Sequence, residues 1–109
     1  SAAGLMHQFC HVGSYVMIQG GCRFSKDIPP YIIAGRDPIA YCGINIVGLR
    51  RRGFTNEQIE SIHNAYRIIY NSGKNVTEAI AQIKEEMTMT PEIAYIVSFV
   101  ENSQRGIIR

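Results

Sequence analysis

Residues 6–28 read MHQFCHVGSYVMIQGGCRFSKDI, and apolar side chains recur in this stretch every six residues. One row consists of Met6, Val12, Ile18 and Phe24, and a second row, four residues further along each unit, consists of Cys10, Val16, Cys22 and Ile28. Six-residue units with two inward apolar positions are typical of a parallel β-helix, in which each unit is one short strand and one turn. Because such a unit cannot bury its apolar face alone, it must stack on neighbouring units.

The six-residue pattern is short. Its four units make little more than one turn of a three-sided coil, fewer than the roughly three stacked repeats that a solenoid needs. We therefore expect the last part of a longer solenoid, or a chain that borrows partners. Pro29 and Pro30 lack backbone donors and should stop the strand pattern. This predicts a terminal coil over residues 1–30 and a connecting arm over 31–44, with one more short strand possible at 32–34.

The apolar period changes to 3.6 residues after the arm, which predicts helices. Asn45 can cap a short helix over 46–52 that stops at Gly53. Three longer helices are expected to begin after the caps Thr55, Asn75 and Thr90. Residues 45–109 are thus predicted to form a helical C-terminal domain.

The bulk properties restrict the class of protein. The chain has 109 residues, 46% of them hydrophobic, and a net charge of +2. One domain is the default at this length, and the charge is too mild to argue for nucleic acid as a partner. No apolar run approaches the roughly 18 residues of a membrane span. The three cysteines form no disulfide or zinc pattern, so we expect reduced thiols and a cytoplasmic location.

Three consecutive arginines, Arg50, Arg51 and Arg52, follow the cap at Asn45. Guanidinium groups bind phosphate oxygens in a bidentate manner, and a helix N-terminus favours anions. A nucleotide diphosphate is therefore a suitable ligand. The alternative is an ordinary solvated basic face.

Histidines are the other candidates for chemistry. His7 should face outward on the coil wall, where it could exchange a proton or donate to a phosphate or sugar. It could equally be a solvated surface residue. A zinc site at His7, Cys10 and His11 is disfavoured because no second ligand pair exists. His63 falls on the apolar stripe of its helix, so we expect a core or boundary residue without a function.

Several stretches together resemble the UDP-N-acetylglucosamine O-acyltransferase family of lipid A synthesis. They are MHQFCHVGSYVMIQGG, SKDIPPYIIAGRDP, GINIVGLRRRGFTNEQI and the terminal RGIIR. The resemblance covers essentially all of the chain, which is similar to the C-terminal part of the family. It implies the end of a left-handed parallel β-helix followed by a C-terminal α-helical domain, in a homotrimer with active sites in clefts between subunits.

The resemblance also implies a reaction. A 3-hydroxyacyl chain would pass from acyl carrier protein to the glucosamine 3-hydroxyl of UDP-N-acetylglucosamine, with no cofactor besides the carrier's phosphopantetheine arm. The family's general base is a histidine in an earlier coil, and this chain begins too late to contain it. We therefore expect no catalytic residue and no metal site here, and no activity from these residues alone.

Substrate-binding positions carry over by resemblance. His7 and Gln8 match the family's HQ pair, in which the glutamine touches substrate. Asn45 and Arg51 match positions that contact the nucleotide, and Arg52 is the adjoining basic residue.

Two further positions bear on specificity. Gly20 matches a position that acts as a ruler for acyl length, where glycine leaves room for a longer chain. Val47 departs from the family pattern, which commonly has glutamate there, so one polar contact to substrate is in doubt.

Two alternatives remain at this point. One is the sister N-acyltransferase of the same pathway or another hexapeptide transferase, against which the NIxGLxRRGF pattern argues. The other is a non-enzymatic helical module that binds nucleic acid through Arg50–Arg52, which would leave the six-residue repeats unexplained.

Overall fold

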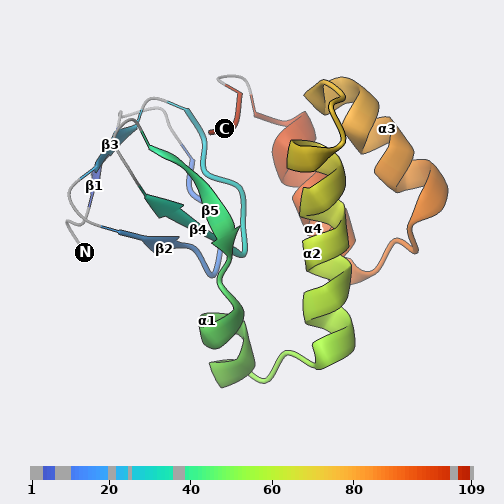
Figure 1. Ribbon diagram of the computed structural model, residues 1–109, viewed down its shortest axis with the longest axis horizontal. Helices are drawn as coiled ribbons and strands as arrows, with labels where there is room; N and C mark the ends of the chain where they lie inside the picture. Colours follow the sequence, from blue (N-terminus) through green and yellow to red (C-terminus); the bar gives the residue numbers. More distant parts are fainter. Residues whose placement is uncertain are drawn as a thin grey trace.

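The computed structural model describes residues 4–6, 11–19, 22–24, 26–35, 39–103 and 106–108. Figure 1 shows the strands gathered on one side and the three longer helices on the other. The strands are β1 (Gly4–Met6), β2 (Met17–Ile18), β3 (Cys22–Phe24), β4 (Ile32–Gly35) and β5 (Ala40–Ile44). The helices are α1 (Ile46–Arg51), α2 (Asn56–Asn71), α3 (Val76–Glu86) and α4 (Pro91–Glu101).

The first pair of strands is parallel and follows the six-residue repeat. β1 pairs with β3, and Met6 lies opposite Phe24, 18 residues later. This spacing equals three six-residue units, as expected for one turn of a three-sided coil. The first-row residues Met6 and Phe24 are thus in register on paired strands, which agrees with the expected end of a parallel β-helix.

The next turn of the coil is two residues shorter. Val12 pairs with Ile28, and Met17 pairs with Ile33, so each partner is 16 residues away. We had placed Ile28 in the second apolar row, but it lies opposite the first-row residue Val12. The reason is that the chain uses two fewer residues between Phe24 and Ile28 than the repeat requires.

Strand pairing does not stop at the two prolines, contrary to our expectation. Pro29 and Pro30 lie in the turn before β4, and the amide of Tyr31 donates to the carbonyl of Ser14 at 2.9 Å. β4 then pairs in parallel with β2. Prolines are tolerated here because a turn does not need their missing donors.

The chain reverses after β4. β5 pairs with β4 in an antiparallel direction and leads directly into α1. β4 confirms the short strand predicted at 32–34, inside the segment 31–44 that we expect to be a connecting arm. The boundaries 1–30, 31–44 and 45–109 stay a prediction.

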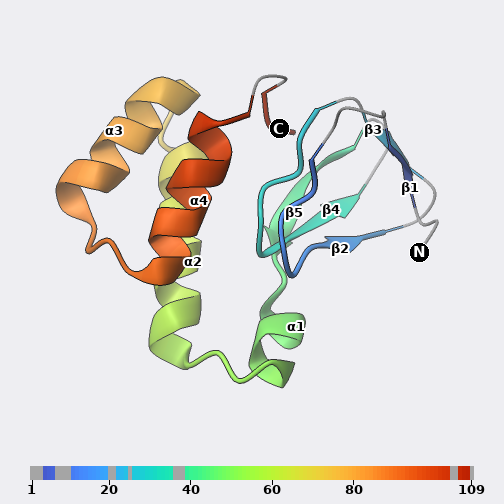
Figure 2. The same ribbon diagram turned by 180° about the vertical axis from the view of Figure 1, so that it is seen from behind.

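The helices begin where the sequence predicts. Thr55 and Asn75 each form a complete capping box, with Gln58 and Glu78 respectively. Thr90 caps α4, whose first residue is Pro91. α2, α3 and α4 pack against one another, as Figure 2 shows from behind. None of the helices in the described part of the chain is long and apolar enough to cross a membrane.

Coil and helices share one hydrophobic core. Ile28 and Ile32 of the coil are fully buried in the same cluster as the inward residues of α2, α3 and α4. The buried hydroxyl of Tyr66 donates to the carbonyl oxygen of Pro30 at 2.7 Å. The rings of Tyr41 and Tyr70 stack with centroids 4.2 Å apart. These contacts fix the coil, and hence α1, relative to the helices.

Candidate functional site

Asn45 joins α1 to two successive turns of the coil. Its backbone amide donates to the carbonyl of Tyr31 at 2.9 Å, and its Nδ2 donates to the carbonyl of Tyr15 at 3.0 Å. Its Oδ1 accepts from the amide of Gly48 at 3.3 Å, which confirms the predicted helix cap. Asn45 is 7% exposed. Its side chain therefore has a structural task in addition to any contact with a ligand.

The conformation of the Asn45 side chain requires a glycine at position 48. A Cβ at position 48 would lie 2.5 Å from Nδ2 of Asn45 and 2.9 Å from its Cγ. Both distances are shorter than van der Waals contact. Only glycine lets the amide return over the first turn of α1, which explains the spacing of Asn45 and Gly48 in the sequence.

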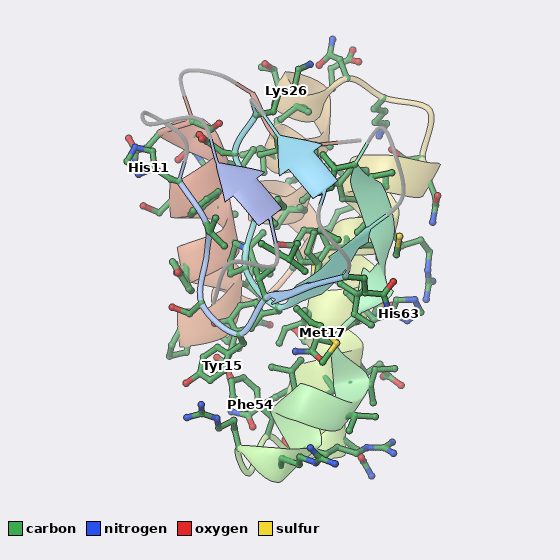
Figure 3. The ribbon with its side chains drawn as sticks, turned by 90° about the vertical axis from the view of Figure 1, so that its left-hand side faces the viewer. His11, Tyr15, Met17, Lys26, Phe54 and His63 are labelled. Atoms are coloured by element: carbon green, nitrogen blue, oxygen red, sulfur yellow. The ribbon has the colours of Figure 1, made fainter. Side chains whose placement is uncertain are left out.

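Two tyrosines mark equivalent corners of the coil. Tyr15 and Tyr31 both have positive φ, 61° and 72° respectively, which is uncommon for bulky residues. Their rings stack with centroids 5.7 Å apart and planes 11° apart. Phe54, just after α1, meets the rings of Tyr15 and Tyr31 edge-on at 5.2 and 5.8 Å. Figure 3 shows Tyr15 and Phe54 side by side where the coil meets α1.

The three arginines are exposed, and Arg52 lies next to one of these aromatic rings. Arg50 and Arg51 form the last turn of α1, and Arg52 caps its C-terminus. The guanidinium carbon of Arg52 lies 5.7 Å from the ring centroid of Tyr15. The structure thus brings Asn45 and Arg52 together through one residue: Asn45 binds the carbonyl of Tyr15, and Arg52 lies over its ring. An exposed guanidinium group can bind an anion such as phosphate.

The N-terminus of α1 adds little to anion binding. We expected its free amides and dipole to contribute, but the side chain of Asn45 already accepts from the amide of Gly48. α1 also has only six residues, so few peptide dipoles are aligned. Any anion at this site would depend chiefly on the guanidinium groups.

The other predicted residues have different outcomes. His7, Gln8 and Gly20 are outside the described residues. Val47, where the family commonly has glutamate, is 63% exposed on α1. His63 is exposed, which corrects our expectation of a core or boundary position. The buried stripe of α2 passes through Ile62 and Tyr66 instead, and His63 lies beside it (Figure 3).

Asp27 is a buried acidic residue whose position the sequence did not predict. This residue is 1% exposed, and its Oδ1 accepts from the amide of His11 at 2.8 Å. Its Oδ2 accepts from the hydroxyl of Ser103 at 2.6 Å. The sequence carries no signal for its burial, because its side-chain partner Ser103 lies 76 residues away. Its role here is structural, because both carboxylate oxygens are held inside the protein.

A groove of about 580 Å³ lies away from the arginines. Its lining includes Val76 and Ile80 of α3, Val100 of α4 and Ile107 of the C-terminal segment. The lining also includes Lys84 and Glu101, but these two charges pair with each other at 2.5 Å, so the groove is not the candidate site. Among the residues that the structure describes, no group of three or more His, Cys, Asp or Glu side chains could hold a metal ion.

Comparison with known proteins identifies the family. A sequence profile described as UDP-N-acetylglucosamine O-acyltransferase, domain 2, matches residues 27–108. The chain belongs to this family. A curated relative from Myxococcus xanthus (strain DK1622), named acyl-[acyl-carrier-protein]–UDP-N-acetylglucosamine O-acyltransferase, is 37% identical over all 109 residues. The chain spans 42% of the length of that relative.

Solved structures of family members have the same fold. LpxA from Bacteroides fragilis 9343, described as a UDP-N-acetylglucosamine acyltransferase, is 73% identical with a TM-score of 0.95. LpxA from Acinetobacter baumannii is 40% identical with a TM-score of 0.90. Each comparison covers 97% of this chain and 42% of the solved chain. The stacked parallel strands and the helices that follow are therefore a shared arrangement.

Proposed function

We propose that this chain is the C-terminal part of an acyltransferase that acts on UDP-N-acetylglucosamine. The enzyme would transfer a 3-hydroxyacyl group from acyl carrier protein to the glucosamine 3-hydroxyl, the first step of lipid A synthesis. The coil would be left-handed, and the general base would come from an earlier part of the polypeptide. The residues of this chain would bind substrate rather than move its protons.

One observation carries the proposal for the binding residues. Exposed guanidinium groups of Arg51 and Arg52 lie at the end of a helix that Asn45 ties to two turns of the coil. Arginines on so constrained a segment can meet a diphosphate with little loss of conformational freedom. We assign Arg51 and Arg52 to the nucleotide, with Asn45 beside them. His7 and Gln8 would contact substrate, and Gly20 would limit acyl length, as the family pattern implies.

The proposal extends to partners and location. Acyl carrier protein would bring the acyl group on its phosphopantetheine arm, so the reaction needs no further cofactor. Exposed apolar side chains on the coil and on α1, namely Met17, Ile46 and Val47, support a homotrimer in which neighbouring subunits cover them. The reduced Cys42 supports a cytoplasmic location.

Replacement of single arginines tests the site. In the full-length polypeptide that carries this chain, we expect Arg51→Ala to weaken binding of UDP-N-acetylglucosamine by roughly 1–3 kcal/mol, or about 5- to 150-fold. Arg67→Ala is a matched control, because Arg67 is an exposed arginine on α2. Titration calorimetry measures both dissociation constants. Equal binding by wild type and Arg51→Ala would contradict the role of Arg51.

Turnover assays test the reaction itself. The full-length polypeptide should acylate UDP-N-acetylglucosamine, and the 109-residue chain alone should not. Preference for an acceptor that already carries a 3-O-acyl group would instead indicate the sister N-acyltransferase. Equal turnover by the chain alone would show that no earlier base is needed.

A further inference from the structure

We propose that Tyr15 is a positioning residue for Arg52, an inference that rests on the proposed nucleotide site. The guanidinium carbon of Arg52 lies 5.7 Å from the ring centroid of Tyr15, within the range of a cation–π contact. The carbonyl of Tyr15 accepts from Nδ2 of Asn45 at 3.0 Å. One residue of the coil is thereby in contact with two of the residues assigned to the nucleotide.

The backbone of Tyr15 makes an aromatic side chain there unusual. A φ of 61° is adopted readily by glycine and asparagine but is costly for a bulky residue. At Tyr31, the equivalent corner one turn later, burial of the ring offsets this cost, since Tyr31 is only 4% exposed. Tyr15 is 40% exposed, so burial offers much less compensation. The contacts made by its ring are therefore the reason for a tyrosine at this corner.

Those contacts hold the Tyr15 ring in a fixed plane. Tyr31 stacks on it, and Phe54 meets it edge-on. A guanidinium group above a fixed ring loses freedom before any ligand arrives, so less is lost on binding. Stacking uses the flat face of the guanidinium and leaves its N–H edge free for phosphate oxygens. Tyr15 would thus orient Arg52 without touching the substrate.

Substitutions at position 15 distinguish the contribution of the Tyr15 ring to binding from that of its backbone carbonyl. Tyr15→Asn removes the ring, tolerates the left-handed backbone, and keeps the carbonyl that binds Asn45. In the full-length polypeptide we expect it to raise the dissociation constant and KM for UDP-N-acetylglucosamine about two- to fivefold, with kcat retained. Tyr15→Phe keeps the ring and should bind like wild type. Thermal melting of each variant checks that folding is intact.

A double-mutant cycle decides whether Tyr15 acts through Arg52. If it does, Tyr15→Asn should weaken binding in the wild type but add nothing to Arg52→Ala. Additive effects, or equal weakening by Tyr15→Phe and Tyr15→Asn, would overturn the inference while leaving the nucleotide site intact. Unchanged binding by Arg52→Ala would instead overturn the assignment of Arg52 to the nucleotide, and this inference with it.

Discussion

The hydroxyl of Ser103 donates to Oδ2 of Asp27 at 2.6 Å and joins the end of α4 to the coil. Next to this bond, the amide of Asp27 donates to the carbonyl of Gly106, and the amide of Ile108 donates to the carbonyl of Asp27. Asp27 and Ile107 form a parallel bridge. The C-terminal segment is therefore held along the coil, with the buried carboxylate at the centre of the contact.

Ser103→Ala should lower the stability of the chain. It removes a hydrogen bond to a buried carboxylate, a type of bond that contributes about 1.5–3 kcal/mol. Ser98→Ala on the exposed face of α4 is the control and should stay within about 0.5 kcal/mol of wild type. Urea unfolding measures the free energy of each variant. Equal stabilities of the two variants would mean that the bond between Ser103 and Asp27 does not stabilise the fold.

Gly13→Ala should lower the free energy of unfolding more than Ser103→Ala does, because the coil leaves no room for a Cβ at position 13. The added atom would lie 2.4 Å from the backbone nitrogen of Pro30 and 2.6 Å from its Cα. Relief of this clash requires one turn of the coil to move off the next, for which we expect a loss of about 3 kcal/mol in the free energy of unfolding.

Gly73→Ala separates this clash from ordinary backbone strain. Gly73 has φ of 77° and no atom within 4 Å of an added Cβ, so the substitution costs strain alone, about 1–2 kcal/mol. In urea unfolding, Gly13→Ala should have a lower free energy of unfolding than Gly73→Ala. The opposite ranking would show that the coil turns are not in close contact at Gly13.

Gly48→Ala should reverse the usual effect of this substitution. Alanine inside a helix normally stabilises by about 1 kcal/mol relative to glycine. Here the new Cβ would displace the side chain of Asn45, breaking both the cap and the bond to Tyr15. We expect a lower melting temperature and weaker binding of UDP-N-acetylglucosamine by the full-length polypeptide. A melting temperature above that of wild type would contradict the proposed packing.

The sequence was most informative where structure depends on neighbours in the chain. Capping boxes at Thr55 and Asn75 predict helix starts because all their partners lie within three residues. The six-residue repeat likewise predicts the pairing of Met6 with Phe24. The repeat did not predict the pairing beyond Phe24. A constant six-residue period implies turns of equal length, whereas the next turn of the coil is two residues shorter.

Features of the site that depend on distant residues were not predictable. The sequence indicated Asn45 as a cap and Arg51 and Arg52 as anion ligands. Nothing in it indicated that Asn45 would bind the carbonyl of Tyr15, because 30 residues separate them. The burial of Asp27 was hidden for the same reason, since its side-chain partner Ser103 lies 76 residues away.

Tyr31 should make the fold sensitive to alkali. Burial, aided by the negative charge of Glu92, raises the pKa of Tyr31 to about 12 from an ordinary value of 10.0. The folded chain therefore keeps this proton when the unfolded chain has begun to lose it. The contribution of Tyr31 to stability is complete below pH 10 and is lost as the pH rises toward 12. In urea unfolding across this interval, wild type should lose stability more steeply than Tyr31→Phe, whose ring cannot ionise. Parallel pH profiles for the two proteins would show that the phenol of Tyr31 ionises as readily in the folded chain as in the unfolded one.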